Sequence, residues 1–464
     1  MKYYLLVDFG STFTKLTAVD LEKEDIISTS KAITTVDTDI TEGYEKALGL
    51  LRENLGYDIK FDKVIACSSA AGGLKMAAIG LVEELTVEAA KRVCLGAGAK
   101  VELVLSHNIN KSEVQSIIDK NIDIILLAGG TNGGNSECVI HNATQLAKSN
   151  VKAPIVFAGN KDAADTIEEI LSTGKKDFYI CENVMPRLNV LNIDSAKNQI
   201  KEIFVKNIIE AKGIKKIEQE IDQVILPTPN AVLLAAELLS KGYDDEIGLG
   251  DLMITDVGGA TTDMYSMGYG YPKQSNVVLR GLDEPFAKRT VEGDLGMRYS
   301  AIGIVDSMSH GEVTHWNKQG IDIVTEAVNR RKHIEFIPKT EHDYKVEDIL
   351  ASKCIDTATS RHVGILEGVY TPLGMMYYQL GKDLTTSNYI IGTGGVVISS
   401  DNPVKMLKNA IQNPSKTMEL RPKAPQYLLD KDYILSAMGL LSLEQPEIAL
   451  RIMKRRIVEI REND

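Results

Sequence analysis

The stretch Asp8-Phe-Gly-Ser-Thr-Phe-Thr-Lys15 decides the fold, because its layout returns far along the chain as Asp256-Val-Gly-Gly-Ala-Thr-Thr-Asp263. Each stretch follows an apolar, β-prone run, places an aspartate at the strand end, and continues with glycine and hydroxyl residues. Glycine lets backbone N–H groups approach phosphate oxygens, because no Cβ is in the way. The carboxylates suit a phosphate-bound Mg²⁺ and its waters. The two stretches therefore predict two phosphate-binding hairpins that clamp one nucleotide between two facing domains.

A third glycine cluster, Gly392-Thr-Gly-Gly395, follows another apolar run. Each cluster alone has little specificity, because Asp and Gly dominate ordinary turns. Together and in this order they resemble the phosphate-1, phosphate-2 and adenosine motifs of the actin/Hsp70/sugar-kinase ATPase superfamily. The resemblance implies an α/β, two-lobed actin-like ATPase fold of duplicated ribonuclease-H-like domains with inserted subdomains. No GxxxxGK[ST] sequence occurs, so nucleotide binding of the P-loop kind is not expected.

Length and composition narrow the function classes. A chain of 464 residues predicts roughly two to four domains. Formal net charge is −12, and the one basic block, Lys454-Arg-Arg456, is interpreted as a solvated helix face, so nucleic acid is not expected as a partner. No apolar run approaches the ~20 residues of a membrane span, and no secretory signal is expected at the N-terminus. The five scattered cysteines fit a reducing, cytoplasmic setting.

Two lobes are expected, at residues 1–225 and 226–464. In the first, strands at 3–8, 13–20 and 26–34, a helix at 41–54 and a strand at 64–67 predict the ribonuclease-H-like core. Strands alternate with helices over about 100–190, which predicts parallel βαβ units added to this lobe. The second lobe is expected to carry a helical insertion at about 306–360, followed by a helix at 360–380. Helices rich in small residues are expected at 231–239 and 436–440, where they cross between the lobes.

The superfamily resemblance assigns roles to residues of the three motifs. It implies ATP and Mg²⁺ as cofactors, with the metal held largely through water. The catalytic and metal-binding residues would be Asp8, Asp256 and Asp263. The nucleotide-binding residues would be Gly10, Ser11, Thr12, Lys15, Gly258, Gly259, Thr261, Thr262, Gly392, Thr393, Gly394 and Gly395.

One position departs from the superfamily pattern. Hsp70-like ATPases carry a glutamate just before a Pro-Thr-Ala helix, where it helps to place the attacking water. Here Thr228 stands at that position, before Pro229. Asp263 or Glu292 are the candidates to orient the water instead. Turnover is therefore expected to be slow, as suits a switch.

Two further stretches narrow the resemblance to one family. Leu127-Ala-Gly-Gly-Thr-Asn-Gly-Gly134 and Thr290-Val-Glu-Gly-Asp-Leu-Gly296, with the placement of the inserted blocks, resemble the MutL-type (GlmL) accessory proteins of adenosylcobalamin-dependent glutamate mutase (methylaspartate mutase). The resemblance implies a chaperone-like ATPase in glutamate fermentation that reactivates or assembles the mutase, whose subunits would be its partners. For the 127–134 loop itself, a plain strand-to-helix turn and an anion site both remain open.

Three alternatives stay open at this point. A small-molecule kinase of the same fold would need a substrate pocket and a catalytic base. An activator ATPase of radical dehydratases starts with a similar hairpin but binds an iron–sulfur cluster with two cysteines per chain, and no cysteine pair here has suggestive spacing. A nucleotide-binding scaffold without turnover would also fit the threonine at position 228. No Asp-x-His-x-x-Gly motif for cobalamin binding occurs.

Overall fold

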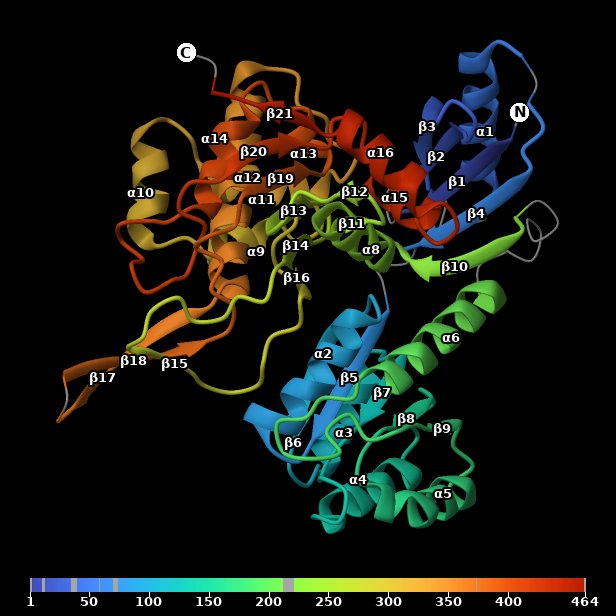
Figure 1. The fold of residues 1–464 in the computed structure, drawn as a ribbon, viewed down its shortest axis with the longest axis vertical. Coiled ribbons are helices and arrows are strands. Elements are labelled where there is room, and N and C mark those ends of the chain that lie inside the picture. The colour runs from blue at the N-terminus through green and yellow to red at the C-terminus, as the bar shows by residue number, and fades with distance from the viewer. Residues whose placement is uncertain are drawn as a thin grey trace. The chain divides into compact units, whose positions relative to one another are not determined.

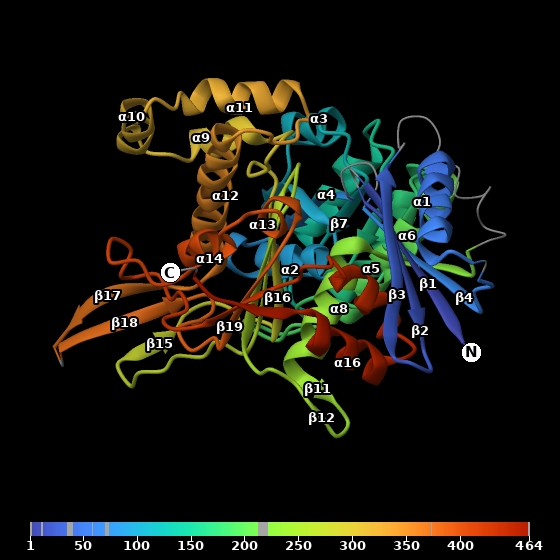
Figure 2. The same cartoon turned by 90° about the horizontal axis from the view of Figure 1, so that it is seen from above.

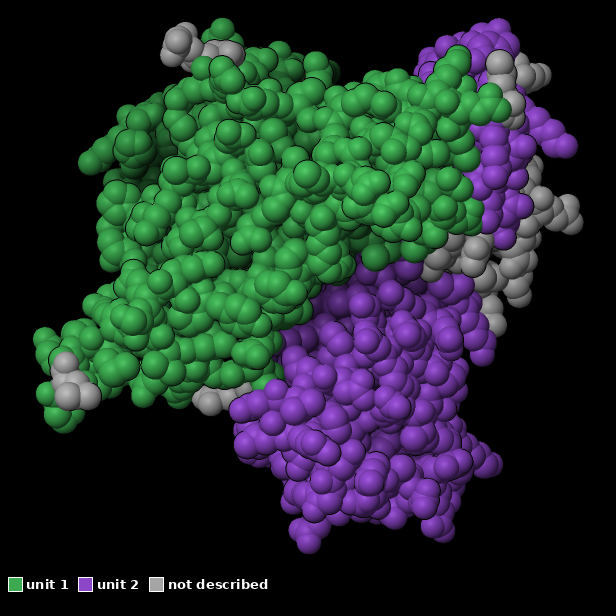
Figure 3. All heavy atoms as spheres, in the orientation of Figure 1, with its two compact units in different colours: residues 1, 19–26, 231–464 green, residues 2–18, 27–230 purple. Residues whose placement is uncertain are grey.

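The structure is a computed structural model that describes residues 2–10, 13–34, 40–57, 59–69, 74–211, 221–372 and 374–462. It divides into two compact units, shown in different colours in Figure 3. Unit 2 comprises residues 2–18 and 27–230, and unit 1 comprises residues 19–26 and 231–464. We describe each unit by itself.

The first sheet contains the N-terminal strands, and its order is β10-β4-β1-β2-β3. β4 lies parallel to both β1 and β10, and β1 is buried along nearly its whole length because the sheet is covered. Helix α1 joins β3 to β4 in the chain. The bounds are β1 (Tyr3–Phe9), β2 (Phe13–Asp20), β3 (Asp25–Ile33), α1 (Ile40–Leu55), β4 (Lys63–Ser68) and β10 (Gln223–Pro227).

Unit 2 holds a second sheet, which is parallel throughout and has the order β6-β5-β7-β8-β9 (Figure 1). Strand β7 is wholly buried, as expected where helices cover both faces of a parallel sheet. The parallel pairing is the one that the strand–helix alternation predicts. The bounds are β5 (Lys75–Gly80), a π-helical turn (Glu83–Val87), α2 (Glu88–Gly96), β6 (Lys100–Ser106), α3 (Lys111–Asp119), β7 (Ile124–Leu127), α4 (Glu137–Ala147), β8 (Ile155–Phe157), a 3₁₀ turn (Lys161–Ala163), α5 (Ala164–Thr173), β9 (Phe178–Ile180) and α6 (Asp194–Ala211).

The main sheet of unit 1 has the order β16-β14-β13-β19-β20-β21. In chain order, its first five strands are arranged 3-2-1-4-5, and the five strands of the first sheet are arranged in the same way. In both sheets the fourth strand lies parallel to the first and to the fifth. The chain therefore contains two ribonuclease-H-like sheets and has the actin-like ATPase fold that the motif order predicts. The bounds are β13 (Leu252–Val257), β14 (Thr262–Met267), β16 (Ala287–Glu292), β19 (Tyr389–Thr393), β20 (Gln426–Leu429) and β21 (Val458–Ile460).

Helices inserted between β16 and β19 cover one part of this sheet (Figure 2). Leu350 and Ile355 of α12 pack in one buried cluster with Met253 and Ile390 of the sheet, and Trp316 packs against the same cluster. Capping boxes at Ser309 and Thr340 explain where two of the helices begin. The bounds are α9 (Ala301–Asp306), α10 (His310–Lys318), α11 (Ile323–Lys332) and α12 (Glu341–His362).

The helix predicted for residues 360–380 is wrong. α12 ends at His362, and the chain then forms β17 (Ile365–Thr371) and β18 (Gly374–Leu380), which pair with β15 (Val277–Leu279) in a three-stranded sheet that extends from unit 1 (Figure 1). The segment is rich in Tyr, Val and Thr, which favour strands. Gly374, at φ 113°, supplies the left-handed backbone that the turn between the two strands needs.

The two helices with small residues that were expected to cross between the lobes contact each other inside unit 1. A Cβ added to Gly439 would lie only 1.8 Å from the carbonyl oxygen of Ala231, so the backbones of α8 and α15 are in direct contact. The remaining elements are α8 (Thr228–Lys241), β11 (Gly242–Tyr243), β12 (Glu246–Ile247), α13 (Gly395–Ile398), α14 (Pro403–Leu407), a 3₁₀ turn (Lys408–Ala410), α15 (Leu435–Leu441) and α16 (Pro446–Arg456). Among the helices that the structure describes, none is long and apolar enough to cross a membrane.

The basic block on α16 is more than a solvated face. Lys454 forms an ion pair with Glu246, and Arg456 forms one with Asp25. Arg451, one turn earlier, binds both carboxylate oxygens of Glu24. These ion pairs join the acidic tip of the β2–β3 hairpin to α16, and the tip is part of unit 1. The paired residues are over 400 positions apart, so local sequence does not reveal the contact.

Candidate functional site

The first motif places three side chains together in unit 2. Asp8, near the end of β1, is 3% exposed, and its Oδ1 accepts a 2.6 Å hydrogen bond from the hydroxyl of Thr228. The Nζ of Lys15 lies 3.5 Å from Oδ2 of the same carboxylate. The hydroxyl of Thr228 thus binds Asp8, and Thr228 supplies no carboxylate of its own.

A buried thiol borders this cluster. Asp8 and Cys67 are partners in the β1–β4 register, and the Cys67 Sγ lies 3.6 Å from Asp8 Oδ1. Burial, and after it the charge of Asp8, raises the pKa of the Cys67 thiol well above its ordinary value. The thiol is therefore protonated at neutral pH and can donate to the carboxylate.

The turn after Asp8 requires glycine at position 10. The Gly10 N–H donates to the carbonyl of Phe13 at 3.1 Å, and a Cβ on Gly10 would lie 2.6 Å from that oxygen. The predicted ligands Ser11 and Thr12 lie outside the described residues.

The second motif forms the turn between β13 and β14. The Gly258 N–H donates to the carbonyl of Thr261 at 2.9 Å, and a Cβ on Gly258 would come within 3.0 Å of that oxygen. The carbonyl of Gly259 accepts hydrogen bonds from the backbone N–H groups of Arg298 and Tyr299. The turn is therefore fixed in one shape, with the predicted phosphate-binding glycines at its tip.

The third motif lies beside the second. β19 runs parallel to β13, so that Thr393 is the register partner of Asp256. Gly394, at φ 93°, packs on the next residue of β13: a Cβ there would lie 2.5 Å from the Val257 carbonyl oxygen and 2.9 Å from Asp256 Oδ1. Gly395 is different, because a Cβ there would meet no atom within 4 Å. Two motifs that are far apart in sequence therefore lie at the same end of two neighbouring strands, β13 and β19, of the unit 1 sheet.

Three of the predicted ligand hydroxyls bind the protein itself, and that of Thr261 donates to Asp263 at 3.1 Å. The hydroxyl of Thr262 is fully buried and donates to the carbonyl of Leu295 at 2.7 Å. Thr393 donates to Asp430 at 3.0 Å. Asp430 was not singled out by sequence reasoning. It is fully buried at the end of β20 and also accepts the N–H groups of Ile434 and Leu435 at the start of α15. An Asp shortly before an apolar helix is the signal that could have revealed this capping role.

The two residues considered for water orientation are both paired with arginine. Asp263 binds Arg289, with 2.6 Å between Asp263 Oδ1 and Arg289 Nη2. Glu292 Oε2 lies 2.6 Å from Nη1 of Arg361, which also binds Asp294. Burial raises the pKa of Glu292 above its ordinary value, and Arg361 opposes that shift.

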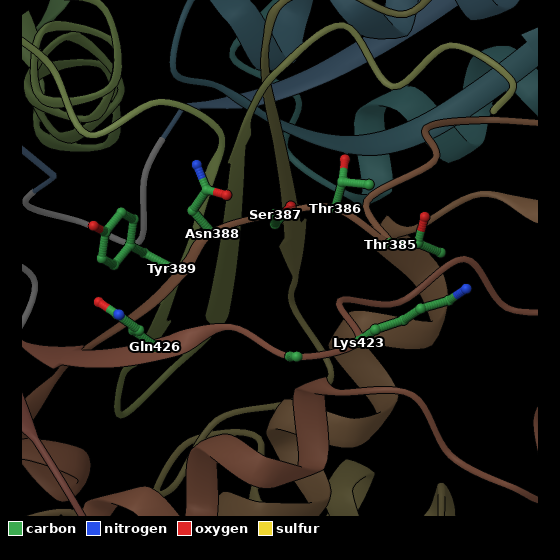
Figure 4. Close-up of a pocket in the computed structure, with 8 residues that line it drawn as sticks. Thr385, Thr386, Ser387, Asn388, Tyr389, Lys423 and Gln426 are labelled. Atoms are coloured by element: carbon green, nitrogen blue, oxygen red, sulfur yellow. The ribbon is translucent and has the colours of Figure 1, made fainter.

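A polar pocket of about 400 Å³ lies at the opposite end of the same sheet (Figure 4). It borders Tyr389 and Gln426, the first residues of β19 and β20, whereas the third motif follows the last residue of β19. Figure 4 shows Tyr389 and Gln426 on one side of the pocket and Thr385 and Lys423 on the other. The pocket is therefore separate from the second and third motifs, which lie in the same unit.

All five cysteines are free thiols, and four of them are buried. Within the described ranges, no group of three or more His, Cys, Asp or Glu side chains is arranged to hold a metal ion directly.

Comparison with known proteins agrees with the family inferred from the motifs. Over 462 residues, 99% of this chain and 100% of the relative, the chain is 50% identical to "Protein MutL" of Clostridium tetanomorphum. Among solved structures, gluconate kinase from Lactobacillus acidophilus is 12% identical (TM-score 0.37, covering 99% of this chain and 93% of that one). Diol dehydratase-reactivating factor in its nucleotide-free form is 11% identical (TM-score 0.33, covering 95% and 99%).

Both structural superpositions are loose, and the fold assignment rests on the shared strand order of the two sheets. The family assignment rests on the full-length identity and on the family model for MutL protein, which matches residues 4–457. The chain belongs to the MutL protein family.

Proposed function

We propose that this protein is an ATP-binding accessory protein that hydrolyses ATP slowly and reactivates or assembles adenosylcobalamin-dependent glutamate mutase. The observation that carries the proposal is the repeated placement of an aspartate and a tight glycine turn. Asp8 and Asp256 lie on the first strand of two sheets with the same strand order, and each is followed by a glycine that a Cβ would crowd. Membership of the MutL family adds the link to the mutase.

The residues fit Mg²⁺ and the phosphates of ATP. Gly10 stands in a turn too tight for a side chain, and a Cβ on Gly258 would be crowded by the carbonyl of Thr261. Glycine at these positions would let backbone N–H groups approach phosphate oxygens. The carboxylates of Asp8 and Asp256 would hold the waters of Mg²⁺, and Lys15 beside Asp8 would add a positive charge toward the phosphates. The metal would neutralise charge on the transferred phosphoryl group. The hydroxyls of Thr261, Thr262 and Thr393 have no part in this proposal, because they bind Asp263, Leu295 and Asp430.

Slow turnover follows from the groups around these aspartates. Thr228 donates its hydroxyl hydrogen to Asp8 and cannot accept a proton from water as a carboxylate would. Asp263 and Glu292 are each engaged by an arginine. Water would therefore be positioned without a strong general base. A slow ATPase suits a cycle in which bound ATP and bound ADP favour different lobe arrangements, since a ligand shifts a conformational equilibrium only by its differential affinity.

Gly395 allows the nucleotide site to be tested apart from the fold. A Cβ at Gly395 meets no protein atom within 4 Å, so Gly395→Leu should leave stability unchanged while filling the space proposed for the adenosine. Gly49→Leu is the matched control, because Gly49 is an exposed glycine on α1 that is equally uncrowded.

The measurement is calorimetric titration of ATP in the presence of Mg²⁺, together with the melting temperature of each variant. The proposal predicts at least tenfold weaker ATP binding for Gly395→Leu at an unchanged melting temperature, and wild-type binding for Gly49→Leu. Equal ATP affinity in the two variants would exclude the nucleotide from this glycine cluster.

A further inference from the structure

Two carboxylates face one another across the hairpin of the second motif. Asp256 on β13 and Asp263 on β14 are direct register partners in an antiparallel pair. Side chains at such positions leave the same face of the sheet with Cβ atoms about 4.5–5.5 Å apart, and like charges there are destabilising. The superfamily resemblance would resolve the repulsion by placing Mg²⁺ between both carboxylates.

In the structure, the side chain of Arg289 offsets this repulsion by binding Asp263. Arg289 on β16 is 5% exposed, and its Nε and Nη2 lie 2.8 Å and 2.6 Å from Oδ1 of Asp263. The other oxygen of Asp263 accepts a 3.1 Å hydrogen bond from the hydroxyl of Thr261. Both oxygens of this carboxylate are therefore occupied by protein donors.

The cation is held firmly in place. Arg289 is opposite Tyr265 in the β14–β16 register, one step along the face from Asp263. Burial by itself would lower the pKa of the guanidinium, but the charge of Asp263 and the contact with Tyr265 outweigh it and raise the pKa. Arg289 is thus a permanent positive charge beneath the hairpin.

We propose that Arg289 is a built-in counter-cation that takes Asp263 out of the metal site, so that unit 1 presents a single carboxylate, Asp256, to Mg²⁺ and its waters. Arg289 is then a positioning residue that acts by binding Asp263. Asp263 itself does not bind the metal in this proposal. This proposal rests on the proposed ATPase function for the identity of the metal, and it replaces the expectation that Asp263 binds Mg²⁺.

The test uses the metal alone. Arg289→Met removes the arginine's positive charge and leaves the carboxylates of Asp256 and Asp263 facing each other. Two facing carboxylates make a better site for a divalent cation than one. The second variant, Arg289→Met with Asp263→Asn, removes both charges of the pair and restores a single carboxylate. Binding of Mn²⁺ without nucleotide is measured by electron paramagnetic resonance of the free ion, together with the melting temperature against Mg²⁺ concentration.

We expect Arg289→Met to bind Mn²⁺ at least tenfold more tightly than wild type and to melt at a higher temperature as Mg²⁺ is added. The double variant should return to the wild-type Mn²⁺ affinity. A merely structural role for Arg289 would weaken the fold without creating a tighter cation site, so wild-type Mn²⁺ affinity in a folded Arg289→Met would overturn the proposal.

A second readout covers the case in which Arg289→Met does not fold. The Mg²⁺ concentration that half-saturates ATP binding is compared for wild type, the double variant and Asp256→Asn. The proposal expects the double variant to match wild type and Asp256→Asn to need at least tenfold more Mg²⁺. A double variant that loses Mg²⁺ dependence as Asp256→Asn does would make Asp263 a ligand and refute the proposal. Failure of wild type to bind ATP at all would instead refute the proposed function and leave the Mn²⁺ result to stand separately.

Discussion

The contact of Gly394 with β13 predicts a large effect for a single methyl group. In Gly394→Ala the residue must keep φ 93° and ψ 147°, a backbone conformation in which an L side chain costs about 1–3 kcal/mol. The new Cβ would also lie 2.5 Å and 2.8 Å from the carbonyl oxygen and nitrogen of Val257. Both are backbone atoms that cannot rotate away, and such overpacking costs roughly 1–3 kcal/mol. The free energy of unfolding of unit 1 should fall by about 2–6 kcal/mol, the sum of these two ranges.

The assay is thermal unfolding, with Gly395→Ala as the matched control. For a unit of this size, 1 kcal/mol corresponds to roughly 2–4 °C in the melting temperature, so Gly394→Ala should melt several degrees or more below wild type. Gly395→Ala adds the same methyl group where no atom lies within 4 Å, at the start of a helix, and should melt at or slightly above the wild-type temperature. Equal melting temperatures for the two variants would refute the packing of the third motif on β13.

Two further predictions concern the stability of unit 1. Gly439→Ala would place a Cβ 1.8 Å from the Ala231 carbonyl oxygen and should lower the free energy of unfolding by about 3 kcal/mol or more, whereas Gly311→Ala, on the uncrowded helix α10, should be neutral or slightly stabilising in urea titrations. His362 is fully buried, and burial, with the nearby charges of Lys288 and Lys382, holds its pKa well below the ordinary value. The His362 side chain therefore takes up a proton more readily in the unfolded chain than in the folded one. Its contribution to the free energy of unfolding is complete above pH ~6.5, and below that pH it is lost at up to about 1.4 kcal/mol per pH unit. Melting temperatures at pH 7.5 and 5.5 should differ less in His362→Gln than in wild type, and an equal difference would contradict this.

The strand and turn of the first two motifs could be predicted because each has a strong local signal for that structure. An apolar run ending in Asp-x-Gly can hardly be anything except a strand followed by a turn. The order of the motifs then fixed the fold, since both hairpins must open a sheet of the same layout. The parallel sheet of unit 2 could also be predicted, because its strands and helices alternate with clear apolar patterns.

The projecting β17–β18 hairpin was missed because its pattern is ambiguous. Leu366, Tyr370, Tyr377 and Leu380 recur at spacings of three, four and seven, as on a helix, although the residue types favour a strand. Its strands pair with each other and with distant β15, and tertiary pairing overrides a weak periodic signal.

The ion pairs and hydrogen bonds of the candidate site could not be predicted from local sequence. The pairing of Asp263 with Arg289 depends on the register of β14 with β16, which sets Arg289 one step diagonally from Asp263. Nothing near Asp263 in sequence indicates which distant strand will lie beside it. The same holds for Thr228 and Asp8, which are 220 positions apart and share a 2.6 Å hydrogen bond. The sequence names candidate residues for the site, but it does not indicate which of their charges the protein itself neutralises.

The most direct test of the proposed function is ATP turnover by the purified protein with Mg²⁺, with and without glutamate mutase that carries inactivated cobalamin, for wild type and Asp256→Asn. The account predicts slow turnover that the inactivated mutase stimulates, together with recovery of mutase activity, and loss of both in Asp256→Asn. Turnover indifferent to the mutase, or rapid transfer of phosphate from ATP to a small-molecule acceptor, would contradict it.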